Sequence, residues 1–310
     1  MVFEEEKGDV VEGKERDAGR IEGKGKGKGE GRIMNVRLVL VVLALFGAQS
    51  NAQVSVSLDS LASPSVSKTM KFVVILPSNY TTNQRYPILY LLHGYSGGQT
   101  DWTRRTKITE YVKDIPLIVV MPDGENSWYV NSASDSLARF ETYMVEDLPI
   151  YVRLHYSIDT TRQAIAGLSM GGYGSIMLAL KHPGMFRFAG SLSGALTYPR
   201  FLGDDTVQPT SGGIRRNLDS IFASQRSRTE YDIFELYRNT RHDSSLYLYF
   251  AMGTQDGFRS FLPVHRMFTD SLRVAKIPYE YHELPGGHNW QFWDREIQPL
   301  LKRMREIMKF

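Results

Sequence analysis

The stretch Gln163–Leu180, QAIAGLSMGGYGSIMLAL, joins an apolar run typical of a buried strand to a second apolar run with the period of a helix. Ser169 stands at the junction, with Gly167 and Gly171 on either side of it. The spacing Gly-x-Ser-x-Gly between a strand and a helix is typical of a nucleophile elbow, a turn so tight that neighbouring side chains must be absent. We therefore expect Ser169 to project from the edge of a sheet, with the backbone N–H of Met170 pointing to where an oxyanion would form.

Strand-like and helix-like segments alternate along the chain from Val54 onward. Apolar and β-branched runs predict strands over 54–60, 68–77, 86–94, 116–124, 162–169, 186–194, 245–256 and 279–287. Helices are predicted over 101–113 with Asp101 as N-cap, 138–156 with a bend near Pro149, 170–183, 260–276 and 290–310. This order indicates an α/β fold with helices on both faces of a mainly parallel sheet. Residues 196–228 interrupt this alternation of strands and helices, and we expect a small insertion over the active site there.

A serine hydroxyl is a weak nucleophile, so Ser169 needs a histidine as general base and a carboxylate that orients it, in the chain order Ser, Asp, His. His288 follows the last predicted strand on the glycine loop LPGGHNW and is the expected base. The other histidines occupy helices, strands or loops that suit a structural role better, namely His93, His155, His182, His242, His265 and His282.

Asp256 is the expected acid because it follows the buried strand-like run in YFAMGTQDG, although QDG is also good turn sequence. Asp243 lies before that strand and Glu283 lies inside the next one, so both are poorly placed. Asp123 comes before Ser169 in the chain and is expected to organise its own loop.

The second oxyanion donor should come from the loop that follows residues 86–94. We expect the backbone N–H of Tyr95 beside that of Met170, with His93 bracing the loop through side-chain hydrogen bonds. Aromatic residues gather in loops at the same edge, where they line a cleft or belong to the core: Tyr95, Trp102, Trp128, Tyr129 and Trp290. The candidate substrate-binding residues among them are Trp128, Tyr129 and Trp290.

The segments YLLHGYSGG, VVMPDGENSWY, GLSMGGYGS, GTQD and PGGHNW together resemble the putative esterase (esterase D-like) family of α/β-hydrolases. That family includes feruloyl and acetylxylan esterases of carbohydrate esterase family one, tributyrin esterase, S-formylglutathione hydrolase and the mycolyltransferases. The resemblance covers the chain from about Ser67 to the C-terminus. It implies the α/β-hydrolase fold, a triad of Ser169, Asp256 and His288, and an oxyanion hole completed by the loop HGYSG.

The resemblance implies a serine carboxylesterase that hydrolyses small acyl, acetyl or feruloyl esters, on a small-molecule or carbohydrate-linked substrate, through an acyl-enzyme. Two alternatives use the same triad: acyl transfer to a sugar acceptor, and thioester hydrolysis like that of S-formylglutathione hydrolase. A non-catalytic binding protein of this fold would need a broken triad, whereas every expected residue is present. No paired histidines with a nearby carboxylate occur at ligand spacing, so we expect no metal and no cofactor.

The 310 residues include 37 basic and 34 acidic side chains, a near balance that predicts no nucleic-acid partner. The chain contains no cysteine, which excludes disulfides and a thiol nucleophile. The composition does not indicate an oligomeric state.

The N-terminal segment has the pattern of an export signal preceded by a charged stretch. Residues 1–33 are rich in Gly and charge, and they are either a disordered leader or a mis-assigned start with translation beginning at Met34. Residues 34–52 combine a basic start, a short apolar run and small residues, as a secretory signal peptide does. We expect a secreted or periplasmic protein whose esterase domain, residues 53–310, has no stable membrane insertion.

Overall fold

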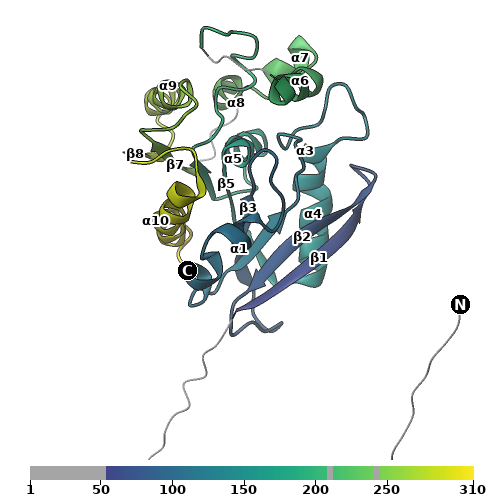
Figure 1. The fold of residues 1–310 in the computed structure, drawn as a ribbon. Helices are drawn as coiled ribbons and strands as arrows, with labels where there is room; N and C mark the ends of the chain where they lie inside the picture. Colours follow the sequence, from purple (N-terminus) through teal and green to yellow (C-terminus); the bar gives the residue numbers. More distant parts are fainter. Residues whose placement is uncertain (1–53, 208–211, 240–244) are drawn as a thin grey trace, which may run out of the picture. The chain divides into compact units, whose positions relative to one another are not determined.

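The computed structural model describes residues 54–207, 212–239 and 245–310. Within them, one sheet has the strand order β1-β2-β4-β3-β5-β6-β7-β8 (Figure 1). The first strand pairs antiparallel with β2, and β2 pairs antiparallel with β4, whereas all later pairs are parallel. The strands are β1 Ser55–Ser63, β2 Lys68–Leu76, β3 Tyr86–Leu92, β4 Ile118–Pro122, β5 Ile158–Leu168, β6 Phe188–Leu192, β7 Tyr247–Gly253 and β8 Tyr279–Leu284. The mainly parallel sheet expected from the sequence is therefore confirmed.

Helices connect the parallel strands and form the insertion. They are α1 Asp101–Arg105, α2 Ile108–Val112, α3 Phe140–Thr142, the π-helical turn η1 Tyr143–Asp147, α4 Leu148–His155, α5 Met170–Lys181, α6 Gly212–Ile221, α7 Gln225–Glu230, α8 Ile233–Asn239, α9 Phe261–Val274 and α10 Trp290–Met308. No helix in the described part of the chain is both long and apolar enough to cross a bilayer.

Successive residues of a strand point to opposite faces, so β3 supplies two separate cores. Ile88, Tyr90 and Leu92 pack into the larger core, together with α4, α5 and α9. Leu89 and Leu91 pack into the other core, together with α1, α2 and α10. All seven residues of β3 are buried, which explains why this strand reads as an unbroken apolar run in the sequence.

The helix predicted over 101–113 is wrong in one respect, because two short helices, α1 and α2, replace it. The N-cap of α1 is Thr100 rather than Asp101, which occupies the first turn. Thr106 ends α1 in an extended conformation, and its hydroxyl donates to the carbonyl of Trp102 at 2.5 Å. The next N–H, that of Lys107, donates to Asp294 of α10 at 2.9 Å, a contact from the far end of the chain that no local pattern reveals.

The predicted helix over 138–156 is interrupted near Pro149, where a break or a bend was expected. The π-helical turn η1 ends at Asp147, directly before α4, which carries Pro149 in its first turn. Proline has no N–H and clashes with the preceding turn, so regular α-helical hydrogen bonding cannot continue through it.

The segment between β6 and β7 forms α6, α7 and α8, which lie beyond α5 at the upper end of Figure 1, and α8 lies outside the predicted insertion 196–228. Hydrogen bonds anchor this segment to the rest of the fold. The indole N–H of Trp128 donates to Asn217 of α6 at 2.8 Å. Tyr231, between α7 and α8, accepts at its carbonyl from the hydroxyl of Tyr173 on α5 at 2.8 Å.

A buried carboxylate, Glu141 of α3, joins the end of α5 to the insertion. It is 5% exposed and accepts hydrogen bonds from Lys181 Nζ at 2.9 Å, His182 Nε2 at 2.8 Å and Tyr231 Oη at 2.7 Å. Lys181 also pairs with Glu230 of α7 at 2.7 Å. Burial opposes ionisation of Glu141, but these hydrogen bonds outweigh it and lower its pKa to about 2.

Replacing Glu141 with glutamine is expected to lower the free energy of unfolding at pH 7 by roughly 3 kcal/mol, since each unit of pKa depression corresponds to about 1.4 kcal/mol. A depressed carboxyl pKa stabilises the fold above its unfolded value and loses that effect as the pH falls towards the folded value. The difference between parent and variant should therefore shrink between about pH 4.5 and about pH 2. Urea unfolding at several pH values measures this difference in the free energy of unfolding. Glu110→Gln is the control, because Glu110 is exposed and its partner Lys113 lies at 3.6 Å; its free energy of unfolding should hardly change. An equal loss of stability in both variants would contradict a special stabilising role for the buried Glu141 carboxylate.

Candidate active site

Ser169 occupies the tight turn between β5 and α5. It caps α5 with φ 52° and ψ −116°, a left-handed backbone conformation that is strained for a residue with a side chain. Its N–H donates to the carbonyl of Leu192 on β6 at 3.0 Å, and its carbonyl accepts from the N–H of Ala195 at 2.9 Å. The turn is therefore tied to the neighbouring strand while the side chain remains half-buried at the sheet edge.

The glycines around Ser169 are required by close contacts, as the sequence predicts. A Cβ at Gly167 would lie 2.6 Å from the backbone of Gly171. One at Gly171 would lie 2.5 Å from the carbonyl oxygen of His93, and one at Gly172 would lie 2.8 Å from Gly194. All three distances are shorter than ordinary van der Waals contact, so β5, α5 and the loop after β3 can meet only through backbone atoms.

Gly171→Ala is expected to destabilise the protein by about 1–3 kcal/mol, because the new methyl group forces the loop after β3 away from α5. Thermal unfolding measures the loss. Gly98→Ala is the matched control, since a Cβ at Gly98 meets nothing within 4 Å. A Gly171→Ala protein as stable as the parent would show that the close approach is not required.

The structure brings Ser169, His288 and Asp256 together in one hydrogen-bonded line. Ser169 Oγ lies 2.9 Å from His288 Nε2, and His288 Nδ1 lies 2.7 Å from Asp256 Oδ2. A carboxylate only accepts hydrogen bonds, so Nδ1 carries the proton and Nε2 is left to accept from the serine hydroxyl. The side chain of Asp256 is 1% exposed and that of His288 is 16% exposed, so the acid is shielded while the imidazole remains accessible.

The loops that carry Asp256 and His288 are fastened to each other. The N–H of Thr254 donates to Leu284 O and that of Gln255 donates to Gly286 O, both at 2.9 Å. The N–H of Gly286 in turn donates to the side chain of Gln255. A Cβ at Gly253 would lie 2.4 Å from the Gly286 oxygen, so the ends of β7 and β8 meet through backbone.

Aromatic rings hold the imidazole, a feature that the sequence analysis missed. Phe258, Phe261 and Trp293 contact His288 edge to face, with ring centroids 4.8, 5.7 and 5.0 Å from its own. The N–H of Phe258 also donates to Asp256 Oδ1 at 2.9 Å, so this residue steadies both partners. Phe258 could have been predicted from the sequence, because it follows Asp256 in an Asp-Gly-Phe turn. Trp293 could not, because it comes from α10 and only the fold places it beside His288.

The loop after β3 lies against Ser169, where the second oxyanion donor is predicted. A Cβ at Gly94 would lie 3.4 Å from that of Ser169. His93 braces the loop as expected: its Nε2 accepts from the N–H of Gly124 at 2.8 Å, so its Nδ1 donates to Gly94 O at 2.7 Å. The N–H groups of Tyr95 and Met170 have no acceptor in the described ranges, which leaves both as potential donors to a substrate oxygen.

Of the two possibilities for the loop aromatics, cleft or core, the structure supports core for Trp128 and Tyr129, which corrects their choice as substrate-binding candidates. Tyr129 is fully buried and its hydroxyl donates to His93 O at 3.0 Å, so it supports the loop after β3. Trp128 is 3% exposed and packs against Tyr95, Tyr173 and Tyr198. Positive φ angles of 57° and 59° at Trp128 and Tyr129 turn both side chains inward.

Trp290 is the one candidate substrate-binding aromatic of the three that stays partly exposed. It begins α10 two residues after His288, and its ring meets Trp102 and Trp293 at centroid distances of 5.4 and 5.2 Å. Trp102 is itself 1% exposed and belongs to the core.

The competing acids have other partners. Asp123 Oδ1 accepts from the N–H of Glu125 at 2.9 Å, which confirms its role in its own loop. Glu283 is paired with Arg266, with Oε1 2.6 Å from Nε. Asp243 and His242 lie outside the described residues. Across the described ranges, no group of three or more His, Asp and Glu side chains is arranged to hold a metal ion.

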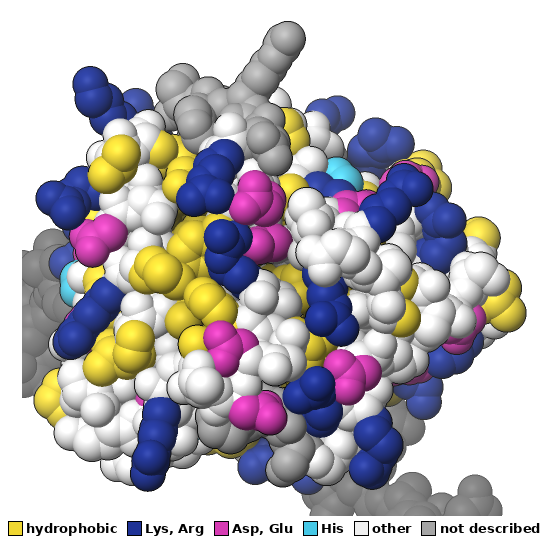
Figure 2. Space-filling view, turned by 90° about the horizontal axis from the view of Figure 1, so that it is seen from above, with side chains coloured by type: hydrophobic (Ala, Val, Ile, Leu, Met, Phe, Trp, Pro, Cys, Tyr) yellow, Lys and Arg dark blue, Asp and Glu magenta, His cyan; other side chains and the backbone are white. Residues whose placement is uncertain are grey.

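Figure 2 shows the molecule from the side of α6 and α7, the end of the sheet that carries the insertion. Hydrophobic side chains gather near the middle of this face, and Lys, Arg, Asp and Glu side chains of both signs surround them.

Proteins with related sequences were found over most of the described chain. Esterase MT1326 of Mycobacterium tuberculosis is 32% identical over 69% of this chain and 51% of its own length, so the chain spans about half of that relative. An acetyl esterase of Caldicellulosiruptor saccharolyticus is 28% identical over 71% of the chain and 83% of its own. The diacylglycerol acyltransferase/mycolyltransferase Ag85B of Mycobacterium avium is 26% identical over 69% and 73%.

Solved structures share the fold. The fluorophosphonate-binding serine hydrolase FphF of Staphylococcus aureus has a TM-score of 0.70 at 26% identity, covering 81% of this chain and 98% of its own. A ferulic acid esterase has a TM-score of 0.70 at 23% identity, covering 82% and 99%. The family model described as putative esterase matches residues 63–304. With its mostly parallel sheet and its serine at the tight turn after β5, the chain adopts the α/β-hydrolase fold and belongs to the putative esterase family.

Proposed function

We propose that the protein is a serine carboxylesterase that hydrolyses small acyl, acetyl or feruloyl esters. The observation that carries this proposal is the line of hydrogen bonds from Ser169 to His288 to Asp256, at 2.9 and 2.7 Å, at the exposed end of a parallel sheet. Family membership and the similarity to an acetyl esterase support the ester chemistry.

In the first half-reaction His288 Nε2 takes the hydroxyl proton as Ser169 Oγ bonds to the ester carbonyl carbon. The carbonyl electron pair moves to oxygen, and that oxyanion receives hydrogen bonds from the N–H groups of Tyr95 and Met170. Asp256 stabilises the imidazolium without taking its proton. When the carbonyl re-forms, the C–O bond to the alcohol breaks and His288 gives the alcohol its proton, which leaves an acyl ester on Ser169.

In the second half-reaction a water molecule loses its proton to His288 and attacks the acyl carbon. Collapse of this intermediate returns the proton to Ser169 Oγ and releases the carboxylic acid. The edge-to-face packing of Phe258 and Trp293 keeps the imidazole in the plane that serves both steps.

The test is a substrate panel with the purified protein: p-nitrophenyl esters of increasing acyl length, methyl ferulate and acetylated xylan. Labelling with a fluorophosphonate, followed by peptide mass spectrometry, should place the adduct on Ser169. Hydrolysis of at least one ester together with that adduct supports the proposal, whereas no adduct and no turnover would overturn it.

Acyl transfer to a sugar is the second candidate, since an Ag85B mycolyltransferase is among the relatives. The same acyl-enzyme would then be attacked by a sugar hydroxyl instead of water. Adding trehalose or glucose to the ester assay and measuring acylated sugar against free acid separates the two reactions. A thioester substrate such as S-formylglutathione, in parallel, tests the remaining alternative.

We further propose that residues 34–52 are a signal peptide and that the mature chain starts at Gln53, in a secreted or periplasmic protein. A chain that starts there retains every described strand, since β1 begins at Ser55. N-terminal sequencing of protein from the native host's periplasm or medium should begin at or near Gln53. Recovery of residues 1–31 on a cytosolic species would contradict the export proposal and would exclude a translation start at Met34.

A further inference from the structure

A cavity of about 670 Å³ opens at the end of the sheet opposite to Ser169. Its walls are the turn before β3, the last turn of α4 and the first residues of β5. Ser169 follows the other end of β5, and a strand of eleven residues spans about 35 Å. The cavity is therefore separate from the site described above.

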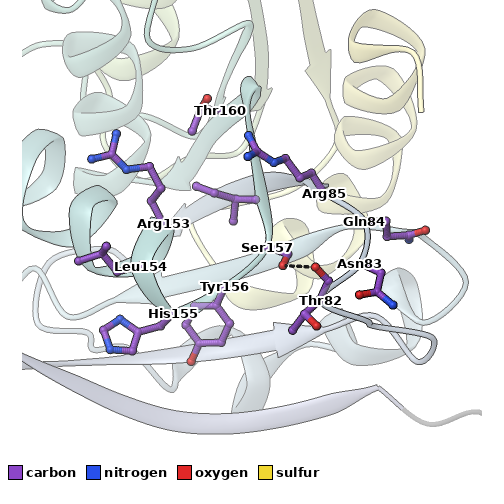
Figure 3. Close-up of a pocket in the computed structure, with 11 residues that line it drawn as sticks. Thr82, Asn83, Gln84, Arg85, Arg153, Leu154, His155, Tyr156, Ser157 and Thr160 are labelled. Carbon is purple, nitrogen blue, oxygen red and sulfur yellow. Dashed lines mark hydrogen bonds between the residues drawn. The ribbon is translucent and has the colours of Figure 1, made fainter.

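The lining of this cavity carries positive charge without any acidic side chain. Arg85 and Arg153 are both exposed, and they line it together with His155, while none of its eleven lining residues is Asp or Glu. Neither arginine has a carboxylate within ion-pair distance in the parts of the chain that the structure describes. Figure 3 shows both side chains extending toward the part of the cavity where Thr160 lies.

Two acids next to lining residues of the cavity have partners of their own. Asp159 pairs with Arg162 Nε at 2.6 Å and accepts from the hydroxyl of Thr161 at 2.7 Å. Asp59 accepts from the hydroxyls of Tyr151 and Tyr156 at 3.1 and 2.9 Å. Neither of these two carboxylates therefore pairs with the guanidinium groups of the cavity.

The rest of the lining suits a polar ligand larger than a single ion. Amide groups of Asn83 and Gln84 and the hydroxyl of Thr160 supply neutral hydrogen-bonding groups, and Leu154, 72% exposed, offers an apolar wall. Ser157 Oγ donates to Thr82 O at 3.2 Å and ties the turn to the strand (Figure 3), so the two walls are held together in advance of binding. The volume lies within the range of about 300–1,000 Å³ found for small-molecule sites.

We propose that this cavity binds an anionic ligand, with Arg85 and Arg153 holding its carboxylate, phosphate or sulfate group. A guanidinium group offers a planar pair of N–H donors that matches the oxygens of such a group, and its charge persists at every physiological pH. Neutral donors and the wall at Leu154 would hold the remainder of the ligand. This inference does not depend on the proposed esterase activity, since it concerns binding at a distant site.

The test is calorimetric titration of the full chain with trigalacturonate, with the neutral maltotriose, and with inorganic phosphate and sulfate separately. The variants are Arg85→Gln and Arg153→Gln, and the control is Arg104→Gln, which removes an exposed arginine of α1 on another part of the fold. Each cavity variant should weaken anion binding about tenfold, the effect of losing roughly 1.4 kcal/mol of charge-assisted hydrogen bonding, while the control binds as the parent does. Added NaCl should weaken binding as well.

Arginine-dependent binding of trigalacturonate but not of maltotriose supports the proposal and identifies a sugar acid as the source of the anion. Arginine-dependent binding of phosphate or sulfate alone supports it with a free anion as the source. The proposal is overturned if no anion binds, or if both cavity variants bind as tightly as the parent. Ester hydrolysis measured on the same variants should stay unchanged, which separates this result from any failure of the proposed function.

Discussion

Replacing Ser169 with alanine is expected to lower kcat/KM for a p-nitrophenyl acyl ester by about 10⁴-fold or more, because the hydroxyl forms the covalent bond to the substrate and nothing nearby can substitute for it. The fold should be retained, since alanine keeps the Cβ and the hydroxyl contributes one half-buried hydrogen bond, to His288. Initial-rate kinetics measures the first expectation, and a circular-dichroism melt measures the second.

Ser191→Ala is the matched control for this variant. Ser191 is fully buried on β6, one strand away from Ser169, and its Oγ has no hydrogen-bond partner among the described residues. Removing an unpartnered hydroxyl should leave activity within about twofold of the parent and should not lower stability. If Ser169→Ala retained activity within about tenfold of the parent, the serine of the tight turn would not be the nucleophile.

Asp256→Asn is expected to lower kcat by about 10²- to 10⁴-fold with little change in KM. The asparagine amide can donate to His288 Nδ1, which favours the tautomer that carries its proton on Nε2 and cannot accept from Ser169. Substrate contacts do not involve this residue, whose side chain is 1% exposed, so binding should be nearly unaffected. Steady-state kinetics over a range of ester concentrations separates the two parameters, and His288→Ala should remove nearly all turnover.

Asp123→Asn is the control, because Asp123 also follows a buried strand but bonds to its own loop, through the N–H of Glu125. We expect a milder loss from it than from Asp256→Asn. A nearly fully active Asp256→Asn protein, alongside an inactive Asp123→Asn or Glu283→Gln protein, would move the acid to another strand and require the site to be rebuilt around it.

Most of the sheet could be predicted from the sequence because its signals are local. The unbroken apolar run of β3 reflects a strand buried on both faces, and the change of period at Ser169 reflects a strand that meets a helix. The strand boundaries were less accurate, since β5 begins at Ile158, four residues before the predicted start. After the buried Ile158, its first residues are exposed or half-buried and lack a continuous apolar pattern.

The structure differs from the sequence-based expectation where distant segments meet. Asp294 of α10 accepts from the backbone N–H of Lys107, where the predicted first helix is divided in two. The sequence left Trp128 and Tyr129 open between a cleft and the core, and their left-handed backbone turns both side chains inward, against the loop of His93 and Tyr95. Such a conformation has no periodic signature, because it depends on what the side chain finds to pack against.

The sequence by itself determined the order of strands and helices, the glycine-flanked turn at Ser169, and the chain order Ser169, Asp256, His288. These features depend on residue type and on spacing over a few positions, so they are visible in the sequence alone. Only the tertiary structure decided the distances of 2.9 and 2.7 Å between the three side chains, the aromatic contacts around His288, and the cavity lined by Arg85 and Arg153 at the far end of β5. Each of these features joins residues that are widely separated along the chain. Such contacts depend on how the strands and helices pack, which a local sequence pattern does not specify.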